Sequence, residues 1–407
     1  MRSRLLLAAL CLAAGAGCHS PHTASAGAPT LDLAARVAQH GFPAVFQAWS
    51  PIEGFNRAPA PASPLAEQES SLQSMARHDL VFLSLGQCGL IPDNRGHEGL
   101  SEGFTPESVQ RARTLKARLL AANPHAVLLA EIRYHDAPGS YLPEDSPWWL
   151  RDPESRRVPK TRGTVLNGYF MLNFAELGWQ EQVATLCAAA VATGAVDGCM
   201  LDWFADDDLA HASLAQKIRE KLGDRGLLIV NVNGHVPSRS APYINGLYME
   251  GFGASFFSDW REAVRNLQWA PSHLRAPAFT ALELWYPAGT PPGPSSGRND
   301  LARMRMVTTL SLCNSDGYAL YSPAPGHAHD WYAFWTPDLG RPIGIIGRVD
   351  PNKAYSRKFE HGTVWFNPPG NAAITVEFPG PVIRKSTGER GVRFVVPAGD
   401  GDIFLAP

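Results

Sequence analysis

Two short apolar runs in this chain each end in a carboxylate. Residues 199–201 lead into Asp202, and residues 246–249 lead into Glu250. A buried parallel strand delivers a charged group to a reaction site at its carboxyl end in this way. Two carboxylates that converge from two such strands indicate acid–base and nucleophilic chemistry on a glycosidic bond. For either residue alone an alternative stays open, since acidic residues at strand ends also pair with arginine or with backbone amides.

The two carboxylates are expected to differ in protonation. Glycosidic bonds break through an oxocarbenium-like transition state, so one carboxylate must be ionised while the other holds a proton for the leaving oxygen. Asp202 is predicted to be the ionised member because its short side chain is held rigidly at a strand end. Glu250 is predicted to be the acid/base because its longer side chain reaches the leaving oxygen. Phe252, if it lines the same site, would shield Glu250 from water and raise its pKa.

Other predicted strand ends supply candidates for substrate binding. Glu131 and Arg133 lie one residue apart on the same face of a strand, which predicts that they pair with each other. Tyr134 and Asp136 are expected to bind substrate hydroxyls as the functional alternative. Glu283 is a reserve candidate for the acid and begins a predicted substrate wall. The complete set of predicted substrate-binding residues is Trp49, Glu131, Tyr134, Asp136, Trp203, Asn231, Asn233, Glu283, Trp285 and Tyr321.

No metal or other cofactor is predicted. His327 and His329 superficially resemble a metal-binding pair, but no further histidine ends a strand to complete a site. The acidic residues 206–208 precede a helix, where capping and the helix dipole explain them, and calcium would need more oxygen ligands. Asn231 and Asn233 end another strand, where one would bond a sugar and the other cap a turn. The chain contains no Gly-x-Ser-x-Gly motif and no glycine-rich phosphate loop after a strand.

A regular alternation of apolar runs and amphipathic stretches must position these residues. The predicted strands are residues 44–49, 80–85, 127–132, 198–202, 227–232, 246–250, 279–284 and 317–321. Predicted helices between them include residues 107–122, 179–193, 209–222 and 300–313. Eight such units predict an α/β protein, a (β/α)8 TIM barrel over residues 37–340. Asp79, Asp197 and Asp316 each precede a strand and are expected to cap or form salt bridges at the non-catalytic end.

Two further segments of the chain have a predicted role: the residues after the barrel and one long loop within it. Short alternating runs separated by turn residues predict a small antiparallel, β-sandwich-like domain over residues 341–407, which is expected to pack against the barrel. Within the barrel, residues 139–172 form a long segment that contains several aromatic residues. Long loops at the catalytic end commonly shape substrate choice, so this segment is expected to cover the cleft.

The amino-terminal residues predict export from a bacterial cell. Arginines at positions 2 and 4 precede an apolar run too short to span a membrane, so residues 1–18 are a predicted signal peptide. Small residues before Cys18 are typical of a lipoprotein cleavage site, with Cys18 as the lipidated residue. Residues 19–36 would then be a flexible tether. The mature protein is expected to be a cell-envelope lipoprotein or a secreted protein.

Composition narrows the choice of partner. A net charge of −2 without any basic tract argues against nucleic acid. The predicted partner is a carbohydrate, because the two strand-end carboxylates indicate chemistry on a glycosidic bond. Any membrane anchoring is through the lipid on Cys18. No C-x-x-C pair occurs, which predicts that the cysteines after position 18 are buried free thiols. The sequence does not indicate an oligomeric state.

Four segments of the chain carry a family resemblance: residues 130–136, 197–204, 335–342 and 357–367. With the β domain they span most of the mature chain, and they resemble the hypothetical glycosyl hydrolase family fifteen. More distantly, an Asp on the fourth strand with an acid on the sixth is similar to α-galactosidase-like and α-1,4-polygalactosaminidase barrels. That likeness implies that Asp202 is the nucleophile and Glu250 the acid/base of a retaining mechanism. A glutamate matches the polygalactosaminidases better, whereas Asn173 departs from related barrels, which often have Asp there.

Together these observations predict an exported glycoside hydrolase that cleaves α-linked O-glycosidic bonds of a polysaccharide or oligosaccharide, with retention. The alternative is a non-catalytic carbohydrate-binding lipoprotein on a TIM-barrel scaffold, whose two carboxylates need not converge. Carboxyl groups about 5–5.5 Å apart would indicate retention and about 6.5–9.5 Å inversion. A separation of more than ~10 Å would favour the non-catalytic alternative.

Overall fold

A computed structural model describes most of the chain. The described residues are 31–49, 71–94, 96–160, 168–204, 207–253, 258–287, 296–324 and 326–407. None of the helices in these ranges is both long and apolar enough to cross a membrane. The predicted signal peptide, Cys18 and most of the predicted tether lie outside the described residues, so export and lipidation stay predictions.

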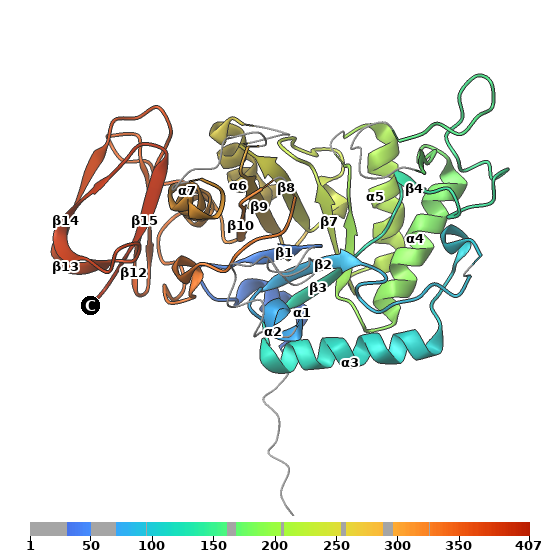
Figure 1. The fold of residues 1–407 in the computed structure, drawn as a ribbon, viewed down its shortest axis with the longest axis horizontal. Helices are drawn as coiled ribbons and strands as arrows, with labels where there is room; N and C mark the ends of the chain where they lie inside the picture. The colour runs from blue at the N-terminus through green and yellow to red at the C-terminus, as the bar shows by residue number, and fades with distance from the viewer. Residues whose placement is uncertain are drawn as a thin grey trace, which may run out of the picture. The chain divides into compact units, whose positions relative to one another are not determined.

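Eight parallel strands form a closed barrel (Figure 1). In order around it they are β1 (Phe46–Ala48), β2 (Leu80–Ser84), β3 (Val127–Glu131), β6 (Gly198–Leu201), β7 (Leu227–Asn231), β8 (Gly246–Phe252), β9 (Phe279–Trp285) and β10 (Tyr318–Ser322). Val45 and Ala319 bridge in parallel, which joins the two ends of the sheet. The strands are covered on both faces, so they consist mainly of buried apolar residues. The predicted (β/α)8 barrel is confirmed.

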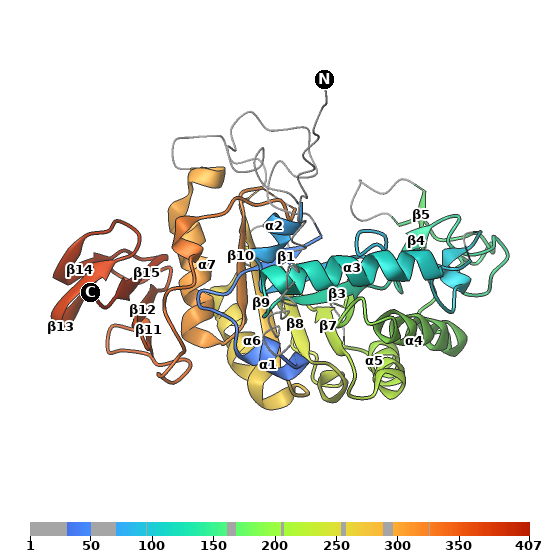
Figure 2. The ribbon, with the colours of Figure 1, turned by 90° about the horizontal axis from the view of Figure 1, so that it is seen from below.

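Helices cover the outside of the strands. They are α1 (Leu33–Ala38), α2 (Ser71–Ala76), α3 (Pro106–Ala122), α4 (Leu177–Ala192), α5 (Leu209–Leu222), α6 (Trp260–His273) and α7 (Leu301–Asn314), with 3₁₀ turns at Glu98–Leu100, Ala241–Tyr243, Gly297–Asn299 and Ala333–Trp335. Asp208, Asp259 and Asp300 cap the first turns of α5, α6 and α7 by accepting backbone N–H groups. Figure 2 shows α4 and α5 side by side on the barrel.

The long segment after β3 folds back on itself. Its strands β4 (Asp136–Pro138) and β5 (Tyr169–Met171) pair antiparallel. The Arg157 guanidinium lies 4.1 Å from the centre of the Phe170 ring and 5.2 Å from that of Trp149. The backbone N–H of Lys160 donates to the carbonyl of Tyr169 at 3.0 Å, which holds Lys160 beside β5.

Acidic residues before three strands make the expected contacts at the non-catalytic end of the barrel. Asp197 is 5% exposed and pairs with Arg36 of α1 and with Lys116 of α3, the latter at 2.7 Å. Asp79 accepts from Asn123 at 3.1 Å, and Asp316 pairs with Arg357 at 2.6 Å. Because Arg36 is buried in this network, α1 belongs to the barrel. The predicted tether over residues 19–36 therefore extends too far along the chain.

The carboxyl-terminal strands form one five-stranded antiparallel sheet. In spatial order they are β11 (Tyr355–Phe359), β12 (Gly362–Asn367), β15 (Asp400–Leu405), β13 (Ile374–Arg384) and β14 (Arg390–Val396). The prediction of an antiparallel β domain is confirmed. Its one sheet curls on itself as a sandwich-like domain would, because Phe404 of β15 contacts Phe378 of β13 and Phe394 of β14, with ring centres 4.9 and 5.1 Å apart. The other face of β12 and β15 packs on α7, and Arg305 of α7 pairs with Asp400 at 2.6 Å.

The four described cysteines, Cys88, Cys187, Cys199 and Cys313, are buried free thiols, as the sequence predicts. Cys313 of α7 faces the C-terminal sheet, because its Sγ lies 3.8 Å from the carbonyl oxygen of Val364.

We predict that Arg357→Ala destabilises the protein by about 2–4 kcal/mol in urea unfolding. Its guanidinium is buried and donates to the carbonyls of Leu312 and Ser315 at 3.1 and 2.7 Å, and to Asp316. Truncation leaves these buried carbonyls without their donor and loosens the sheet from the barrel.

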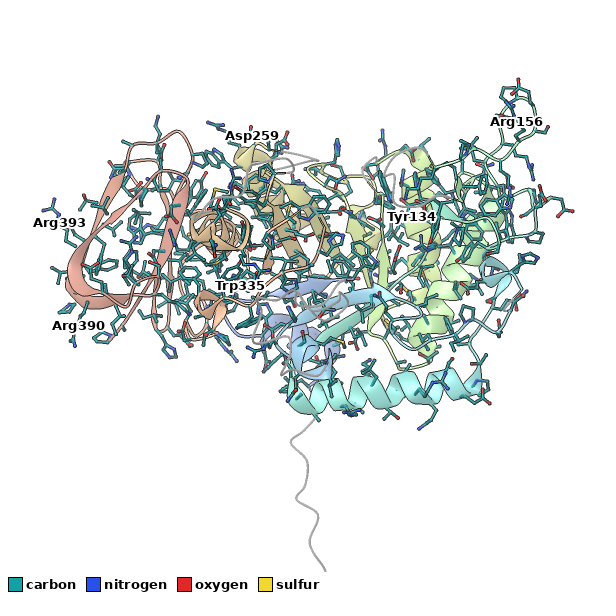
Figure 3. The ribbon with its side chains drawn as sticks, in the orientation of Figure 1. Tyr134, Arg156, Asp259, Trp335, Arg390 and Arg393 are labelled. Carbon is teal, nitrogen blue, oxygen red and sulfur yellow. The ribbon has the colours of Figure 1, made fainter. Side chains whose placement is uncertain are left out.

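The matched control for this variant is Arg393→Ala. Arg393 points away from the rest of the chain (Figure 3), and it pairs with Glu377 at 3.5 Å with both side chains 69% exposed. Its loss should change stability by less than ~0.5 kcal/mol. Equal effects of the two variants would show that Arg357 does not tie the sheet to the barrel.

Candidate active site

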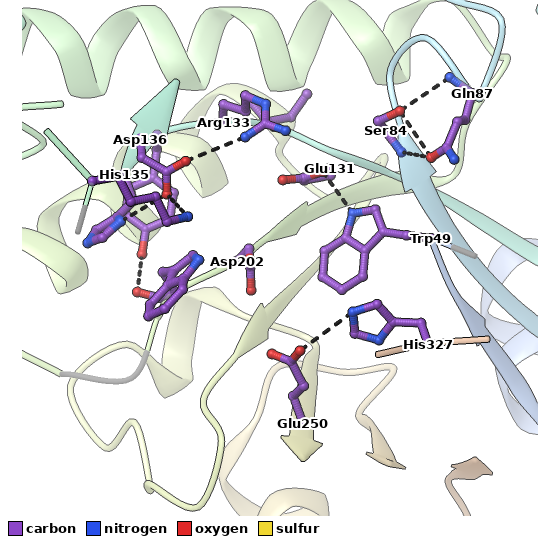
Figure 4. Close-up of a pocket in the computed structure, with 14 residues that line it drawn as sticks. Trp49, Ser84, Gln87, Glu131, Arg133, His135, Asp136, Asp202, Glu250 and His327 are labelled. Atoms are coloured by element: carbon purple, nitrogen blue, oxygen red, sulfur yellow. Dashed lines mark hydrogen bonds and ion pairs between the residues drawn. The ribbon is translucent and has the colours of Figure 1, made fainter. Parts of the chain in front are cut away.

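A cavity of about 710 Å³ opens at the carboxyl ends of the barrel strands (Figure 4). Both predicted catalytic carboxyl groups line it, together with residues from β2, β3 and the long segment that follows β3. The lining residues are Trp49, Ser84, Gln87, Glu131, Ile132, Arg133, Tyr134, His135, Asp136, Lys160, Asp202, Trp203, Glu250 and His327. A cavity of this size is typical of small-molecule and saccharide sites.

Asn231 joins the two carboxyl groups. Its side-chain amide donates one hydrogen bond to Asp202 Oδ1 at 2.7 Å and another to Glu250 Oε2 at 2.6 Å. The two oxygens therefore lie no more than about 5.3 Å apart, the combined length of these bonds. Asn231 is at the end of β7, which lies between the strands that carry Asp202 and Glu250. The sequence placed Asn231 among sugar-binding residues, whereas in the structure it bridges the pair.

A bulge in β8 directs Glu250. The pairing of β8 with β9 shifts register between Met249 and Phe252, and Gly251 there has a φ of 69°, which glycine adopts without strain. Such bulges re-aim side chains next to active sites. Glu250 is 9% exposed, whereas Asp202 is only half-buried. The two carboxyl groups thus have different environments, as a pair of acid and nucleophile requires.

The pKa of Glu250 is raised from 4.5 to about 8. Burial is the main cause, and the nearby carboxyl groups of Asp202 and Glu283 add to it, while His327 and the Asn231 hydrogen bond act in the opposite direction. Phe252, expected to help bury Glu250, is itself 2% exposed. Glu250 therefore holds its proton at neutral pH.

His327 links Glu250 to a fully buried second acid. Its Nδ1 lies 3.1 Å from Glu283 Oε2, and its Nε2 lies 3.5 Å from Glu250 Oε1. Glu283 is 0% exposed and also accepts a hydrogen bond from the Tyr248 hydroxyl. Burial lowers the pKa of His327, but the carboxyl groups of Glu283, Glu250 and Asp202 raise it more, to about 9. Glu283, the reserve acid, thus lies behind the cavity as a partner of His327.

Asp136 organises the opposite wall of the cavity. It is 4% exposed and pairs with Lys160 at 2.6 Å, with His135 at 3.4 Å and with Arg133 at 3.6 Å. Burial raises the pKa of Asp136, but these three partners lower it to a net value below the ordinary one. No ion pair within 4 Å joins Arg133 to Glu131 among the described residues, although the Arg133 charge still lowers the pKa of Glu131 against the larger effect of burial. The physical reason is that β3 ends at Glu131, so the alternation of side chains does not continue to Arg133.

Two tryptophans at strand ends support the neighbouring polar groups. Trp49 donates from Nε1 to Glu131 Oε2 at 2.7 Å, and burial raises the pKa of Glu131. The Trp203 ring stacks on His135 with centroids 5.7 Å apart, and Lys160 Nζ lies 4.7 Å from its centre. Trp49 and Trp203 have φ values of 43° and 56°. Such left-handed backbone costs a bulky residue about 1–2 kcal/mol, and strain of this kind clusters at functional sites.

Four predicted binding residues remain to be placed: Tyr134, Asn233, Trp285 and Tyr321. Tyr134 lines the cavity and donates to the Trp203 carbonyl at 2.8 Å, and the Asn233 N–H donates to Asn231 Oδ1 at 3.3 Å. Trp285 packs with its ring 5.6 Å from that of His327. Tyr321 does not line the cavity, because its buried hydroxyl donates to the Gly297 carbonyl at 2.7 Å. We therefore assign Tyr321 to packing.

The acidic run and the two histidines after β10 have structural partners. Asp208 caps α5, and Asp207 accepts from the Ser240 hydroxyl at 2.7 Å, whereas Asp206 lies outside the described residues. His329 contacts the buried His78, with 2.8 Å between their Nε2 atoms. In the described part of the chain no three His, Cys, Asp or Glu side chains are placed to hold a metal ion.

Sequence reasoning missed Ser84, Gln87, His135 and Lys160 and weighed His327 only as a metal ligand. Ser84 ends β2, and the other four lie in loops without periodicity. Their one available signal was position, since each ends or follows a predicted strand or lies in the long segment expected over the cleft.

The raised pKa of Glu250 makes a prediction about stability. Between about pH 4.5 and pH 8 the folded protein binds the Glu250 proton more tightly than the unfolded chain does. The free energy of unfolding therefore falls as pH rises through that window. Glu250→Gln should therefore be more stable than the wild type by ~2 kcal/mol at pH 8.5 and similar to it at pH 5, in urea unfolding. A variant that is destabilised equally at both pH values would contradict the assigned environment. Glu377→Gln, on the exposed face of the C-terminal sheet, is the control.

Comparison with known proteins shows the fold. No protein-family profile matches the sequence, and no curated protein matches it. Among solved structures, an α-amylase from Lactobacillus plantarum is 11% identical, with a TM-score of 0.52 over 92% of this chain and 100% of its own. A noncanonic maltogenic α-amylase from Thermotoga neapolitana (11% identity, TM-score 0.51) matches 89% of this chain and 99% of its own. An α-amylase from Malbranchea cinnamomea (12% identity, TM-score 0.51) matches 91% of this chain and 96% of its own. The chain thus shares the barrel and C-terminal β domain of solved α-amylases.

Proposed function

We propose that this protein is a retaining glycoside hydrolase with Asp202 as nucleophile and Glu250 as acid/base. The observation that carries the proposal is the bridge through Asn231, which keeps one oxygen of each carboxyl group within about 5.3 Å of the other. Retaining enzymes have their two carboxyl groups about 5–5.5 Å apart, whereas inverting enzymes need about 6.5–9.5 Å for a water molecule. The protonated state of Glu250 at neutral pH suits the acid.

The reaction proceeds in two displacements. First the Asp202 carboxylate attacks the anomeric carbon, the bond to the leaving oxygen breaks, and the Glu250 proton passes to that oxygen. Then Glu250 takes a proton from water, the water oxygen attacks the anomeric carbon, and Asp202 is released. One water is consumed and both carboxyl groups return to their starting states.

We propose an α-linked polysaccharide or oligosaccharide as the substrate. Two observations support this proposal: the α-amylases among the solved structures of the same fold, and the resemblance of the sequence to α-acting barrels, with hypothetical glycosyl hydrolase family fifteen as the family. The non-catalytic alternative predicts carboxyl groups that diverge or lie more than ~10 Å apart. The short bridge gives that alternative no support.

Hydrolysis of a polysaccharide panel tests the proposal. The panel contains α-glucans, α-galactosides and α-galactosaminan, with a β-glucan for contrast. Asp202→Asn should lower kcat/KM on the active substrate by at least ~10³-fold, because the variant lacks the carboxylate that forms the covalent intermediate. Glu250→Gln should lower it by ~10²–10⁴-fold, and by less on a substrate whose leaving group needs no proton.

Glu377→Gln serves as the activity control because this carboxyl is exposed and remote from the cavity. Turnover that survives both site substitutions would move the chemistry to another acid, Glu131 or Glu283. Sugar binding without turnover in the wild type would favour the non-catalytic alternative.

We also propose export with lipidation at Cys18, supported by the signal-like residues 1–18. In a bacterial host, radiolabelled palmitate should label the wild type, and the protein should sediment with membranes. Cys18→Ser should abolish the label and release the protein into the soluble fraction. An unlabelled wild type would contradict lipidation and leave secretion as the route.

A further inference from the structure

His327 reaches the cavity from the loop that follows β10. It lines the cavity beside Glu250, with its ring centre 4.7 Å from that of Trp49 and 5.6 Å from that of Trp285. These two aromatic rings confine the imidazole, so its two nitrogens face fixed partners. One partner, Glu250, belongs to the proposed catalytic pair, while the other, Glu283, lies behind the cavity.

Glu283 dictates the charge of His327. A fully buried carboxylate needs a positive partner, because its charge is otherwise costly to remove from water. Among the described residues, His327 is the basic group within ion-pair distance of Glu283, with Nδ1 at 3.1 and 3.3 Å from its two oxygens. The Tyr248 hydroxyl also donates to Glu283. With Nδ1–H directed at Glu283, the second proton of the cation lies on Nε2, which faces Glu250 Oε1.

We propose that His327 is a positioning residue that presents a positive charge to Glu250 and stabilises its ionised form between the two steps of the reaction. The proposal rests on the proposed function. When Glu250 gives its proton to the leaving oxygen, a buried anion is created, and Asp202 is at that moment an uncharged ester. The His327 cation at 3.5 Å from Oε1 and the Asn231 amide at 2.6 Å from Oε2 then stabilise both oxygens of that anion.

The groups around His327 settle the direction of its effect. Glu283 faces it from β9, Glu250 and Tyr248 from β8, and Asp202 from β6, while the neighbouring His329 is neutral because burial lowers its pKa to about 4. At neutral pH, where Glu250 is still protonated, Glu283 and Asp202 keep His327 charged, with Glu283 the larger cause. The charge of His327 in turn lowers the pKa of Glu250. Without the cation Glu250 would hold its proton more tightly and would be a poorer base in the second step.

The test compares His327→Gln with the wild type and with His273→Gln, a histidine on the exposed end of α6. In His327→Gln the alkaline limb of the pH profile of kcat/KM should move to higher pH by about one unit, because the positive charge beside Glu250 is gone and the pKa of Glu250 rises. At pH 6.5, kcat on an activated aryl glycoside should fall ~10-fold with a burst of released aryl group, and it should recover as pH rises. His273→Gln should match the wild type.

The proposal would be overturned if the alkaline limb of the kcat/KM pH profile of His327→Gln did not move. It would also be overturned if this variant lost activity equally at every pH and in both steps. A second measurement needs no turnover and so separates this inference from the proposed function. In the wild type, NMR of the histidine rings should show His327 charged to about pH 9, and in Glu283→Gln it should lose its proton at lower pH. A wild-type His327 that titrates near 6.5 would overturn the proposal even if glycosidase activity is found, and this readout remains decisive if His327→Gln does not fold.

Discussion

The whole site depends on one amide that serves two carboxyl groups. Asp202 and Glu250 come from strands that are not neighbours, and β7 lies between them in the barrel. The end of β7 is therefore the position from which a side chain reaches both, and Asn231 provides two N–H donors there. A carboxylate at this position would repel both acids, and an apolar side chain would leave them to repel each other. The uncharged donor permits two acids at short range without a third charge.

On each side of the Asn231 bridge, the other acidic groups of the site are paired with basic groups. On one side Glu250 is followed by His327 and then by the buried Glu283. On the other side Asp136 is balanced by Lys160 and Arg133. Glu250 has His327 at 3.5 Å as its one basic partner among the described residues, whereas Asp136 has Lys160, His135 and Arg133. Burial therefore raises the pKa of Glu250, while the partners of Asp136 lower its pKa below the ordinary value.

The sequence predicted the barrel well because its signal is local. A parallel strand buried on both faces must be an apolar run, and its carboxyl end must meet the other strand ends at one face of the barrel. Asp202 and Glu250 could therefore be placed together from sequence alone. Contacts that depend on loops could not be placed: Lys160 arrives from an antiparallel excursion, and His327 from a segment without periodicity.

Two predictions differ from the structure because they rested on local sequence alone. The pairing of Glu131 with Arg133 assumed a strand that continues past Glu131, yet the strand ends there. Arg133 forms its ion pair with Asp136 and acts on Glu131 only through its charge. Residues 33–36 were assigned to a tether, although long-range contacts of Arg36 with Asp197 and with the Ala126 carbonyl draw this helix into the barrel. Similarly, Asn231 looked like a ligand for sugar hydroxyls because nothing in the sequence states that two acids flank it in space.

The central claim is that Asp202 forms a covalent bond to the sugar. A 2-deoxy-2-fluoro glycosyl fluoride of the active sugar slows the second step, so the intermediate accumulates. Peptide mapping by mass spectrometry should then find one fluoroglycosyl group on the peptide that contains Asp202, and the account predicts that label. A label on a different carboxylate, or steady turnover of the reagent with inverted product and no label, would contradict it.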